Sequence, residues 1–287
     1  MSRVEVRKTH KLFIAGAFPR SESGRIYEVT AADGSFIANV AQASRKDARD
    51  AVLAARAAFA KWSTATAYNR GQVLYRIAEV MEGRREQFIA EVEGGEGLSA
   101  KKATQQVDAA IDRWVWYAGW ADKYTQVLGN TNPAAGPFFN FSIPEPTGVV
   151  AAVAPQDAGV IGLVSVIAPI IVTGNAVIVM PSPAHPIPAI TLAECLATSD
   201  VPGGVVNILT GAPAEVMPWL AEHADVNALD LTGIVDVSVS TDLQRQAAGT
   251  VKRVRQPKSE VDWYTTPTLA RIRGFTETKT VWHPLGS

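Results

Sequence analysis

The stretch GVVAAVAP, residues 148–155, is the first of a series of short apolar runs that decide the fold of this chain. NAVIVM (175–180), GVVNILTG (204–211) and VNALDLTG (226–233) follow at similar spacing. Such continuous Val, Ile and Leu runs are typical of parallel strands that are buried on both faces. Helical patterns separate them, near 159–172, 187–198, 213–222 and 236–249. We therefore predict an α/β fold with a doubly wound, mostly parallel sheet and flanking helices.

The region before this series predicts short strands followed by helices. Residues 11–43 favour two or three short strands, with turns at Ser23-Gly24 and Asp33-Gly34. Ser44 and Asp47 have the spacing of a capping box and predict a helix start. Further helices are expected over roughly 67–93 and from about Ser99 to 126, which suits a layer on one face of the sheet.

Two further segments favour exposed strands, the first of them as an arm outside the core sheet. FFNFSIPE (138–145) lies between two prolines and favours an exposed strand. The tail alternates over 275–282, as expected of an edge strand or a pairing edge for another subunit. Between them KRVR (252–255) predicts the end of a strand, and the path of 256–273 is left open between a linker and a short helix near 267–273.

Composition restricts the partners. The net charge is −1, from 27 basic and 28 acidic side chains, so no basic face for nucleic acid is expected. The most apolar stretch, 158–172, is too short and too interrupted by Gly and Pro to span a membrane. There is one cysteine, Cys195, and the first residues lack the apolar region of a secretory signal. We expect a cytoplasmic protein.

In a parallel sheet, ligands bind beyond the carboxyl ends of the strands. The residues to examine there are Pro155-Gln156-Asp157, Met180-Pro181-Ser182-Pro183, Thr210-Gly211-Ala212-Pro213 and Thr232-Gly233-Ile234. No GxGxxG motif is present. TGAPAEV (210–216) favours a structural turn over a dinucleotide contact, because Pro213 removes a backbone donor.

Other candidate sites have simpler structural interpretations. Cys195 lies on an apolar helical face and is expected to be an inert core thiol rather than a nucleophile. The S-x-x-K at 99–102 favours a helix N-cap over a serine nucleophile. His185 is expected to be a loop histidine, and no histidine has metal-ligand spacing, so no metal site is predicted. Trp116 and Trp120 share a helix face and favour packing.

Several motifs in order resemble the NAD-dependent aldehyde dehydrogenase superfamily, from Lys11 to about Val254. They are EPTGVVAAVAP (145–155), GNAVIVMPSPAHPIPAITLAE (174–194), VPGGVVNILTG (201–211), ALDLTGIVDV (228–237) and AAGTVKRV (247–254), with GFTETKTVWHPLG (274–286) resembling the superfamily's final strand.

The resemblance implies that the catalytic domain, which lies in the middle of the family's chains, is missing here. In the family, the KRV strand leads into a segment with the general-base glutamate, then into a catalytic domain with the nucleophilic cysteine. Here Pro257 falls where that glutamate is expected, and no cysteine follows residue 195, so no catalytic residue is predicted. The implied domains are 1–137 with 147–255 as the Rossmann-type domain, 138–146 with 274–287 as oligomerisation strands, and 256–273 as a linker that replaces the catalytic domain.

The resemblance also implies a degenerate cofactor cleft. The family's oxyanion asparagine aligns with Asp157, and the tryptophan before it aligns with Gln156. The lysine and the glutamate that bind the cofactor's ribose align with Met180 and Pro183. A family serine aligns with Ile234. We therefore expect no tightly bound cofactor and at most weak NAD(P) binding. The expected cleft residues are Gln156, Asp157, Met180, Ser182, Gly211, Thr232 and Gly233.

The chain is similar to the shortened, cysteine-less second unit of two-unit aldehyde dehydrogenases. This predicts a non-catalytic assembly or regulatory subunit, either a homo-oligomer or a hetero-oligomer with a full-length aldehyde dehydrogenase. Two alternatives stay open: an NAD(P)-dependent aldehyde dehydrogenase active only with a partner subunit, and a binding module for another nucleotide or metabolite, lined by Gln156, Asp157 and His185. The expected interface residues are Phe139, Phe141, Thr278, Thr280 and Trp282.

Overall fold

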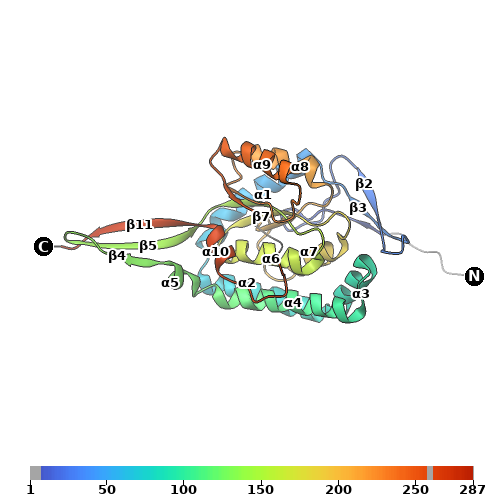
Figure 1. Cartoon of the computed structure of the whole chain (residues 1–287), viewed down its shortest axis with the longest axis horizontal. Coiled ribbons are helices and arrows are strands. Elements are labelled where there is room, and N and C mark those ends of the chain that lie inside the picture. The colour runs from blue at the N-terminus through green and yellow to red at the C-terminus, as the bar shows by residue number, and fades with distance from the viewer. Residues whose placement is uncertain (1–7, 257–260, 287) are drawn as a thin grey trace, which may run out of the picture.

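A five-stranded parallel sheet forms the centre of the computed structural model, which describes residues 8–256 and 261–286 (Figure 1). The strand order is β10-β9-β6-β7-β8. Their bounds are β6 Val149–Val153, β7 Ala176–Met180, β8 Val206–Ile208, β9 Ala228–Asp230 and β10 Arg253–Arg255. The chain builds outward from β6 in both directions, so the predicted doubly wound α/β fold is confirmed.

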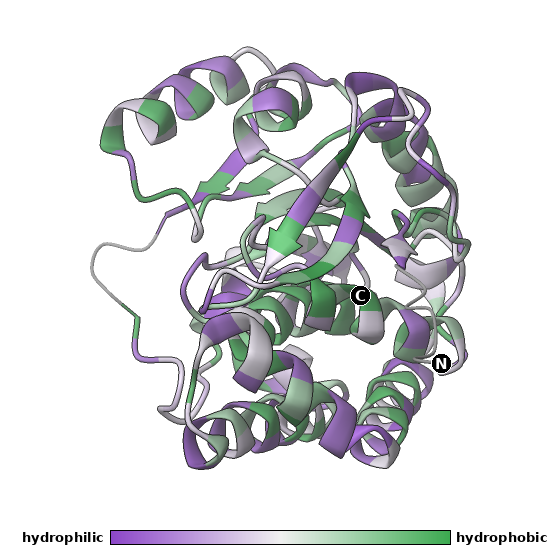
Figure 2. Ribbon diagram, turned by 90° about the vertical axis from the view of Figure 1, so that its right-hand side faces the viewer, coloured by the Kyte–Doolittle hydropathy of each residue, from purple (hydrophilic) through white to green (hydrophobic). Residues whose placement is uncertain are grey.

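Helices cover both faces of this sheet, and alternate residues of each strand face opposite layers. The helices after the strands are α6 Gly159–Val172, α7 Ile187–Ala197, α8 Pro213–Glu222 and α9 Val237–Ala248, close to the predicted bounds. Val149 and Ala151 pack in the core formed with α1, α8 and α9, whereas Val150 and Ala152 pack toward α2, α4 and α6. The continuous apolar runs therefore reflect burial on two faces (Figure 2).

The N-terminal strands and helices agree with the sequence pattern, apart from two helix breaks. The elements are β1 Thr9–His10, β2 Ile26–Thr30, β3 Phe36–Ala41, α1 Arg45–Thr64, α2 Ala67–Gly83, α3 Arg85–Glu96, α4 Ala100–Trp120 and α5 Tyr124–Leu128. The single helix expected over 67–93 was wrong, because Arg84 leaves helical geometry and its side chain binds Glu194 of α7 at 2.6 Å. The helix expected to reach 126 ends at Trp120.

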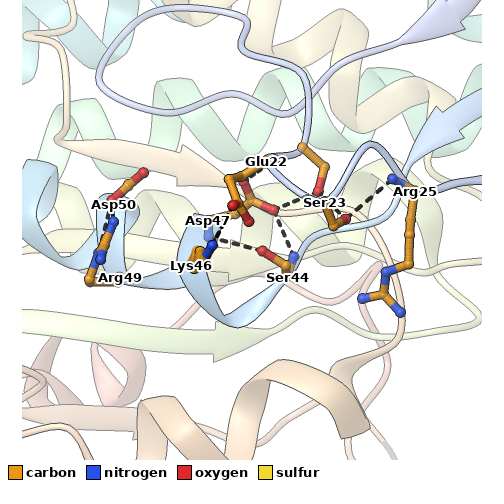
Figure 3. Close-up of polar contacts among 9 residues, drawn as sticks. Glu22, Ser23, Arg25, Ser44, Lys46, Asp47, Arg49 and Asp50 are labelled. Atoms are coloured by element: carbon orange, nitrogen blue, oxygen red, sulfur yellow. Dashed lines mark hydrogen bonds and ion pairs between the residues drawn. The ribbon is translucent and has the colours of Figure 1, made fainter.

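The start of α1 has the capping box that the sequence predicts (Figure 3). Ser44 Oγ accepts from the Asp47 N–H at 3.3 Å, and Asp47 Oδ2 accepts from the Ser44 N–H at 2.7 Å. The buried Asp47 carboxylate also accepts from Ser21 Oγ at 2.7 Å and from the Glu22 N–H at 2.9 Å. One carboxylate therefore joins the N-terminal segment to the first helix.

A three-stranded antiparallel arm projects from the domain (Figure 1). It consists of β4 Asn130–Asn132, β5 Phe138–Pro146 and β11 Thr276–Pro284, in the order β11-β5-β4. β5 and β11 pair along their whole length, from Thr276 opposite Pro146 to Pro284 opposite Phe138. The two segments that the sequence assigned to an arm are thus paired with each other.

The chain between β10 and β11, residues 256–275, leads from the parallel sheet to the arm, and we call this segment the crossing. Pro257 and its neighbours to residue 260 lie outside the described residues. Residues 261–269 run as turns and extended chain, and α10 Ala270–Gly274 follows, near the short helix expected over 267–273. Across residues 8–256 and 261–286, no helix combines the length and apolarity needed to cross a bilayer.

Candidate functional site

The loops after β6, β7, β8 and β9 meet at one edge of the parallel sheet, as expected for the carboxyl ends of its strands. After β6, Gln156 folds back, and its Nε2 donates to the Ala154 carbonyl at 2.7 Å. Asp157 is exposed and lies two residues before α6, next to the N-cap Ala158. The position expected to hold an oxyanion-binding amide therefore carries an exposed carboxylate.

Two hydrogen bonds of Gln106 in α4 connect Glu96 of α3 to the start of α6. Gln106 Oε1 accepts from the Val160 N–H at 3.0 Å, and Gln106 Nε2 donates to Glu96 Oε2 at 3.0 Å. The other oxygen of Glu96, Oε1, is buried without a hydrogen-bond partner. Burial raises the pKa of Glu96, and the charge of Asp157 adds to this rise. Glu96 and Asp157 therefore place two acidic groups near one helix N-terminus.

The next expected cleft residues, at the end of β7 and in the loops after β7 and β8, are either buried or part of a turn. Met180 and Ser182 are buried. Gly211 has a φ of +120°, which side chains rarely adopt, and it leads directly into α8. Its neighbour Thr210 donates its hydroxyl to the Ala41 carbonyl at 2.6 Å. These contacts agree with the structural turn that the sequence favoured.

The loop after β9 packs closely against the loop after β6, and an ion pair occupies the space beside it. A Cβ on Gly233 would lie 1.9 Å from the Ala154 carbonyl oxygen, so this glycine permits close approach of two loops. Thr232 donates its hydroxyl to Asp230 Oδ1 and accepts from Arg271 Nη2 at 3.0 Å. Arg271 Nη1 lies 2.9 Å from Oδ2 of Asp230, whose side chain is fully buried. The Thr232 hydroxyl is therefore already engaged within the protein.

The crossing segment is held against the domain by two buried arginines. Arg271 lies over the Trp263 ring, with 5.1 Å between its Cζ and the ring centroid. Arg113 of α4 donates to the carbonyl oxygens of Trp263 and, at 3.2 Å, Thr265. Burial lowers the pKa of Arg113, and the charge of Arg271 adds to the effect. Residues 263–271 are therefore held against α4 and the end of β9.

The sequence patterns did not predict a site role for Asp230, Arg271, Arg113 or Trp263. A signal exists for Asp230, since an aspartate within the apolar run VNALDLTG needs a buried partner. Nothing in the sequence identifies that partner, because Arg271 is 41 residues away and reaches it only through the crossing.

Residues 261–264 of the crossing line an open pocket of about 720 Å³ beside the start of α6. Asp157, Ala158, Glu96 and residues of α4 form one side, and residues 261–264 form the other. His185 lines a different, mostly apolar pocket of about 330 Å³ between the β2–β3 hairpin, α3 and α7. Asp157 and His185 thus line separate pockets that share Glu96.

The remaining candidate residues are buried, packed or placed at a helix end. Cys195 is buried in α7, and burial raises the pKa of its thiol to about 11. The Trp116 and Trp120 rings pack 5.5 Å apart on α4. Ser99 has the extended backbone of an N-cap, but its side chain makes no capping hydrogen bond. Among the residues that the structure describes, no group of His, Cys, Asp or Glu is arranged to hold a metal ion.

The five expected interface residues lie on opposite faces of the arm. Phe139 is opposite His283 and Phe141 is opposite Val281, whereas Thr280 is opposite Ser142. Because side chains alternate along a strand, Phe139 and Phe141 share one face. Thr278, Thr280 and Trp282 occupy the other, where Phe138 packs 5.8 Å from Trp282 and Ser142 and Thr280 share a 2.8 Å hydrogen bond.

The fold of this chain has counterparts among known proteins. The model of the aldehyde dehydrogenase family matches residues 18–256. The chain belongs to the aldehyde dehydrogenase family. The family match ends at residue 256, so the assignment of the tail to the family's final strand stays a prediction.

Relatives of the chain are longer enzymes. The cytosolic 10-formyltetrahydrofolate dehydrogenase of Xenopus tropicalis is 32% identical over 263 residues, covering 88% of this chain and 29% of that protein. The cytosolic aldehyde dehydrogenase 1 of Elephantulus edwardii is 33% identical over 243 residues, covering 83% of this chain and 48% of that protein. The chain thus spans about half or less of these relatives.

Solved aldehyde dehydrogenases share its fold. The betaine aldehyde dehydrogenase of Staphylococcus aureus, solved with NAD+, superposes with a TM-score of 0.81 at 25% identity and covers 86% of this chain and 49% of that one. An NAD-dependent aldehyde dehydrogenase from Sinorhizobium meliloti superposes with the same TM-score at 27% identity, over 87% and 50% of the two chains.

The side chains of this family member fit NAD poorly at the expected cleft. Met180 has no hydrogen-bonding group to replace a ribose-binding lysine, and its side chain is fully buried. Pro213 occupies the first turn of α8 and offers no N–H to a phosphate. The Thr232 hydroxyl is engaged by Asp230 and Arg271.

Proposed function

We propose that this chain is a non-catalytic assembly or regulatory subunit of an NAD-dependent aldehyde dehydrogenase and associates through its arm. The observation that carries the proposal is the full pairing of β5 with β11, although only residues 256–275 connect β10 to β11. A folded domain needs about 50 residues or more. The connection is therefore too short to hold a catalytic domain, while both arm strands are present.

The state of the single cysteine supports a non-catalytic role. The resemblance implies a cysteine nucleophile that follows the KRV strand, and this chain has no cysteine after Cys195. The Cys195 thiol is buried, and its pKa of about 11 keeps it protonated at neutral pH. A thiol in that state is a poor nucleophile.

The proposal includes at most weak NAD(P) binding and a cytoplasmic location. Each charged contact that is missing from a cofactor site costs about 1.5–3 kcal/mol, so the loss of several reduces affinity by orders of magnitude. The relatives described above are named as cytosolic enzymes, and we place this chain in the same compartment.

The exposed surface of the arm supports association. Phe138, Phe139, Trp282 and Leu285 are large apolar side chains that are 41–58% exposed on or beside a paired ribbon. Exposed apolar groups on a sheet with a free edge favour pairing with another chain. The partner we propose is a full-length aldehyde dehydrogenase or a second copy of this chain.

The experiment is the native mass of the untagged complex isolated from its own cells, with each component identified. A full-length aldehyde dehydrogenase in fixed ratio supports a hetero-oligomer, and a homo-oligomer supports self-assembly through the arm. A monodisperse monomer without a co-purifying dehydrogenase contradicts the proposal. Aldehyde-dependent NADH formation by the pure chain would instead show an enzyme.

Variants on the two faces of the arm locate the contact. Phe139→Ser and Trp282→Ser each remove an exposed ring from one face, and Tyr68→Ser on α2 is the matched control, since Tyr68 is 71% exposed. We expect at least one arm variant to dissociate the complex and the control to leave it intact. If both arm variants keep the native mass, the arm is not the interface.

A further inference from the structure

The arm carries a long strand edge that is open to another chain. β11 is an outer strand of the arm, and its register with β5 runs without a shift over nine residues, 276–284. Residues 277–280 and 282–284 are exposed, and the arm projects away from the domain (Figure 1). Within residues 8–256 and 261–286, no further strand pairs with this edge. A long, flat, open edge is a template for strand addition.

The backbone groups that point to this edge belong to the even-numbered residues of β11. At the two ends of the β5–β11 pair, the Leu285 N–H donates to the Pro137 carbonyl at 2.7 Å, and the Thr147 N–H donates to the Phe275 carbonyl at 3.3 Å. The odd-numbered residues of β11 therefore bond to β5, because antiparallel pairs alternate between bonded and non-bonded positions. The central residues whose N–H and C=O groups point outward are Thr278, Thr280 and Trp282.

The prolines of the arm agree with this assignment. Pro144, Pro146 and Pro284 all occupy even-numbered, non-bonded positions of the β5–β11 pair. Their missing N–H groups therefore cost no hydrogen bond between these two strands. It follows that a proline at another even-numbered position of β11 would remove an outward N–H and leave the bonds to β5 in place.

The charges along β11 suit a second copy of the same strand. In an antiparallel pair centred on Thr280, Glu277 lies opposite His283 of the second copy, and Lys279 lies opposite Val281. Centring the pair on Lys279 would place two lysines opposite each other, which is destabilising. Centring it on Val281 would place Lys279 opposite His283, again two basic side chains. Registers further away shorten the overlap of the two strands.

An exposed aromatic pair lies beside this contact. Trp282 is 58% exposed and Phe138 is 41% exposed, and their rings pack 5.8 Å apart on one face of the arm. In the register centred on Thr280, Trp282 lies opposite Thr278 of the second copy. Cross-strand contacts of aromatic and β-branched side chains stabilise antiparallel pairs. The pairing therefore covers part of an aromatic surface that a single chain leaves in water.

We propose that β11 pairs antiparallel with β11 of a second copy of this chain, with Thr280 facing Thr280 across a two-fold axis. Two three-stranded arms then form one six-stranded sheet in the order β4-β5-β11-β11-β5-β4. Both copies use the same patch, so the contact closes as a dimer. The inference rests on the proposed function, association through the arm, and specifies its edge, its partner and its register.

A proline on the open edge tests the pairing. Thr278→Pro removes an outward N–H from each copy, and Thr278→Val is the matched control because it keeps that N–H. Analytical ultracentrifugation of the full chain should show a dimer for the parent and for Thr278→Val, and at least about tenfold weaker association for Thr278→Pro. Circular dichroism checks that the variants fold. Equal association of Thr278→Pro and Thr278→Val overturns the proposal.

Disulfide formation tests the register independently. With the single cysteine removed by Cys195→Ala, the variants Glu277→Cys and His283→Cys are mixed and oxidised with copper phenanthroline. Directly opposite non-bonded residues have Cα atoms about 4.5 Å apart, which a disulfide can bridge. We expect linked dimers from the mixture and none from either variant alone, since two copies of one position lie about 20 Å apart.

The outcomes separate this inference from the proposed function. Absence of the mixed disulfide overturns the register and with it the proposal. A parent chain that is monomeric alone and assembles only with a full-length aldehyde dehydrogenase overturns the self-pairing and leaves the proposed function standing. A parent chain that is monomeric and has no such partner overturns both.

Discussion

Arg271 and Asp230 form a buried ion pair that ties the crossing to the end of β9, with 2.9 Å between Nη1 and Oδ2. The pair joins residues 41 positions apart, and Thr232 and Trp263 contact the same guanidinium. The end of a central strand is therefore held by the segment that leads into the arm. This relationship makes the crossing part of the folded domain rather than a free linker.

Removing Arg271 should destabilise the whole domain. Arg271→Met leaves the fully buried Asp230 carboxylate without its cation, and an unpaired buried charge costs about 3–5 kcal/mol in the free energy of unfolding. Urea unfolding followed by circular dichroism measures this change. Arg273→Met, an exposed neighbour in α10, should change stability by less than about 0.5 kcal/mol.

A double variant distinguishes the contribution of the ion pair from the loss of side-chain packing. Asp230→Asn combined with Arg271→Met removes both charges, so it should recover part of the stability that Arg271→Met loses. If the double variant is as unstable as the sum of the single ones, the ion pair does not account for the effect.

Asp47 provides a second test, at the start of α1. Asp47→Ala removes the acceptor for Ser21, Glu22 and Ser44, and we expect a loss of about 2–3 kcal/mol in the free energy of unfolding. Differential scanning calorimetry measures the loss. Asp50→Ala, about one turn later, removes a carboxylate that pairs with its exposed neighbour Arg49 and should have little effect. Equal losses in the two variants would contradict the role given to the cap.

The sheet, its helices and the arm were predictable because they depend on local patterns. Runs such as GVVAAVAP encode burial on two faces, and the Ser44–Asp47 spacing encodes a cap. The break at Arg84 was missed because helical periodicity continues through it, and it depends on contact with Glu194. The site was predicted less well. Its pocket is formed by 261–264 packing against Asp157, which is a contact between distant segments.

Cys195 should be protected from thiol reagents in the folded protein. Its side chain is buried, and its pKa of about 11 leaves little thiolate at neutral pH. We expect a disulfide reagent such as DTNB to react slowly with the native chain and rapidly in denaturant. Cys195→Ala gives the background rate. Fast, stoichiometric reaction of the native protein would show an accessible thiol and weaken the case for an inert cysteine.

His10 should make stability fall in mild acid. It is only 8% exposed in β1, and burial, with the charge of Lys8 adding to the effect, lowers its pKa to about 4 from the ordinary value of 6.5. The unfolded chain therefore binds a proton between pH 6.5 and 4 that the folded chain does not bind. The stabilisation is complete above pH 6.5 and is lost as the pH falls toward 4, by about 3 kcal/mol.

Urea unfolding between pH 7 and 4 measures this slope, and a His10→Gln variant identifies its source. The amide cannot gain a proton in this range, so the variant should lose about 3 kcal/mol less than the parent over the same interval. His283→Gln, on the exposed end of β11, is the matched control and should keep the parent's slope. Parallel pH profiles for the parent and His10→Gln would mean that other groups cause the acid sensitivity.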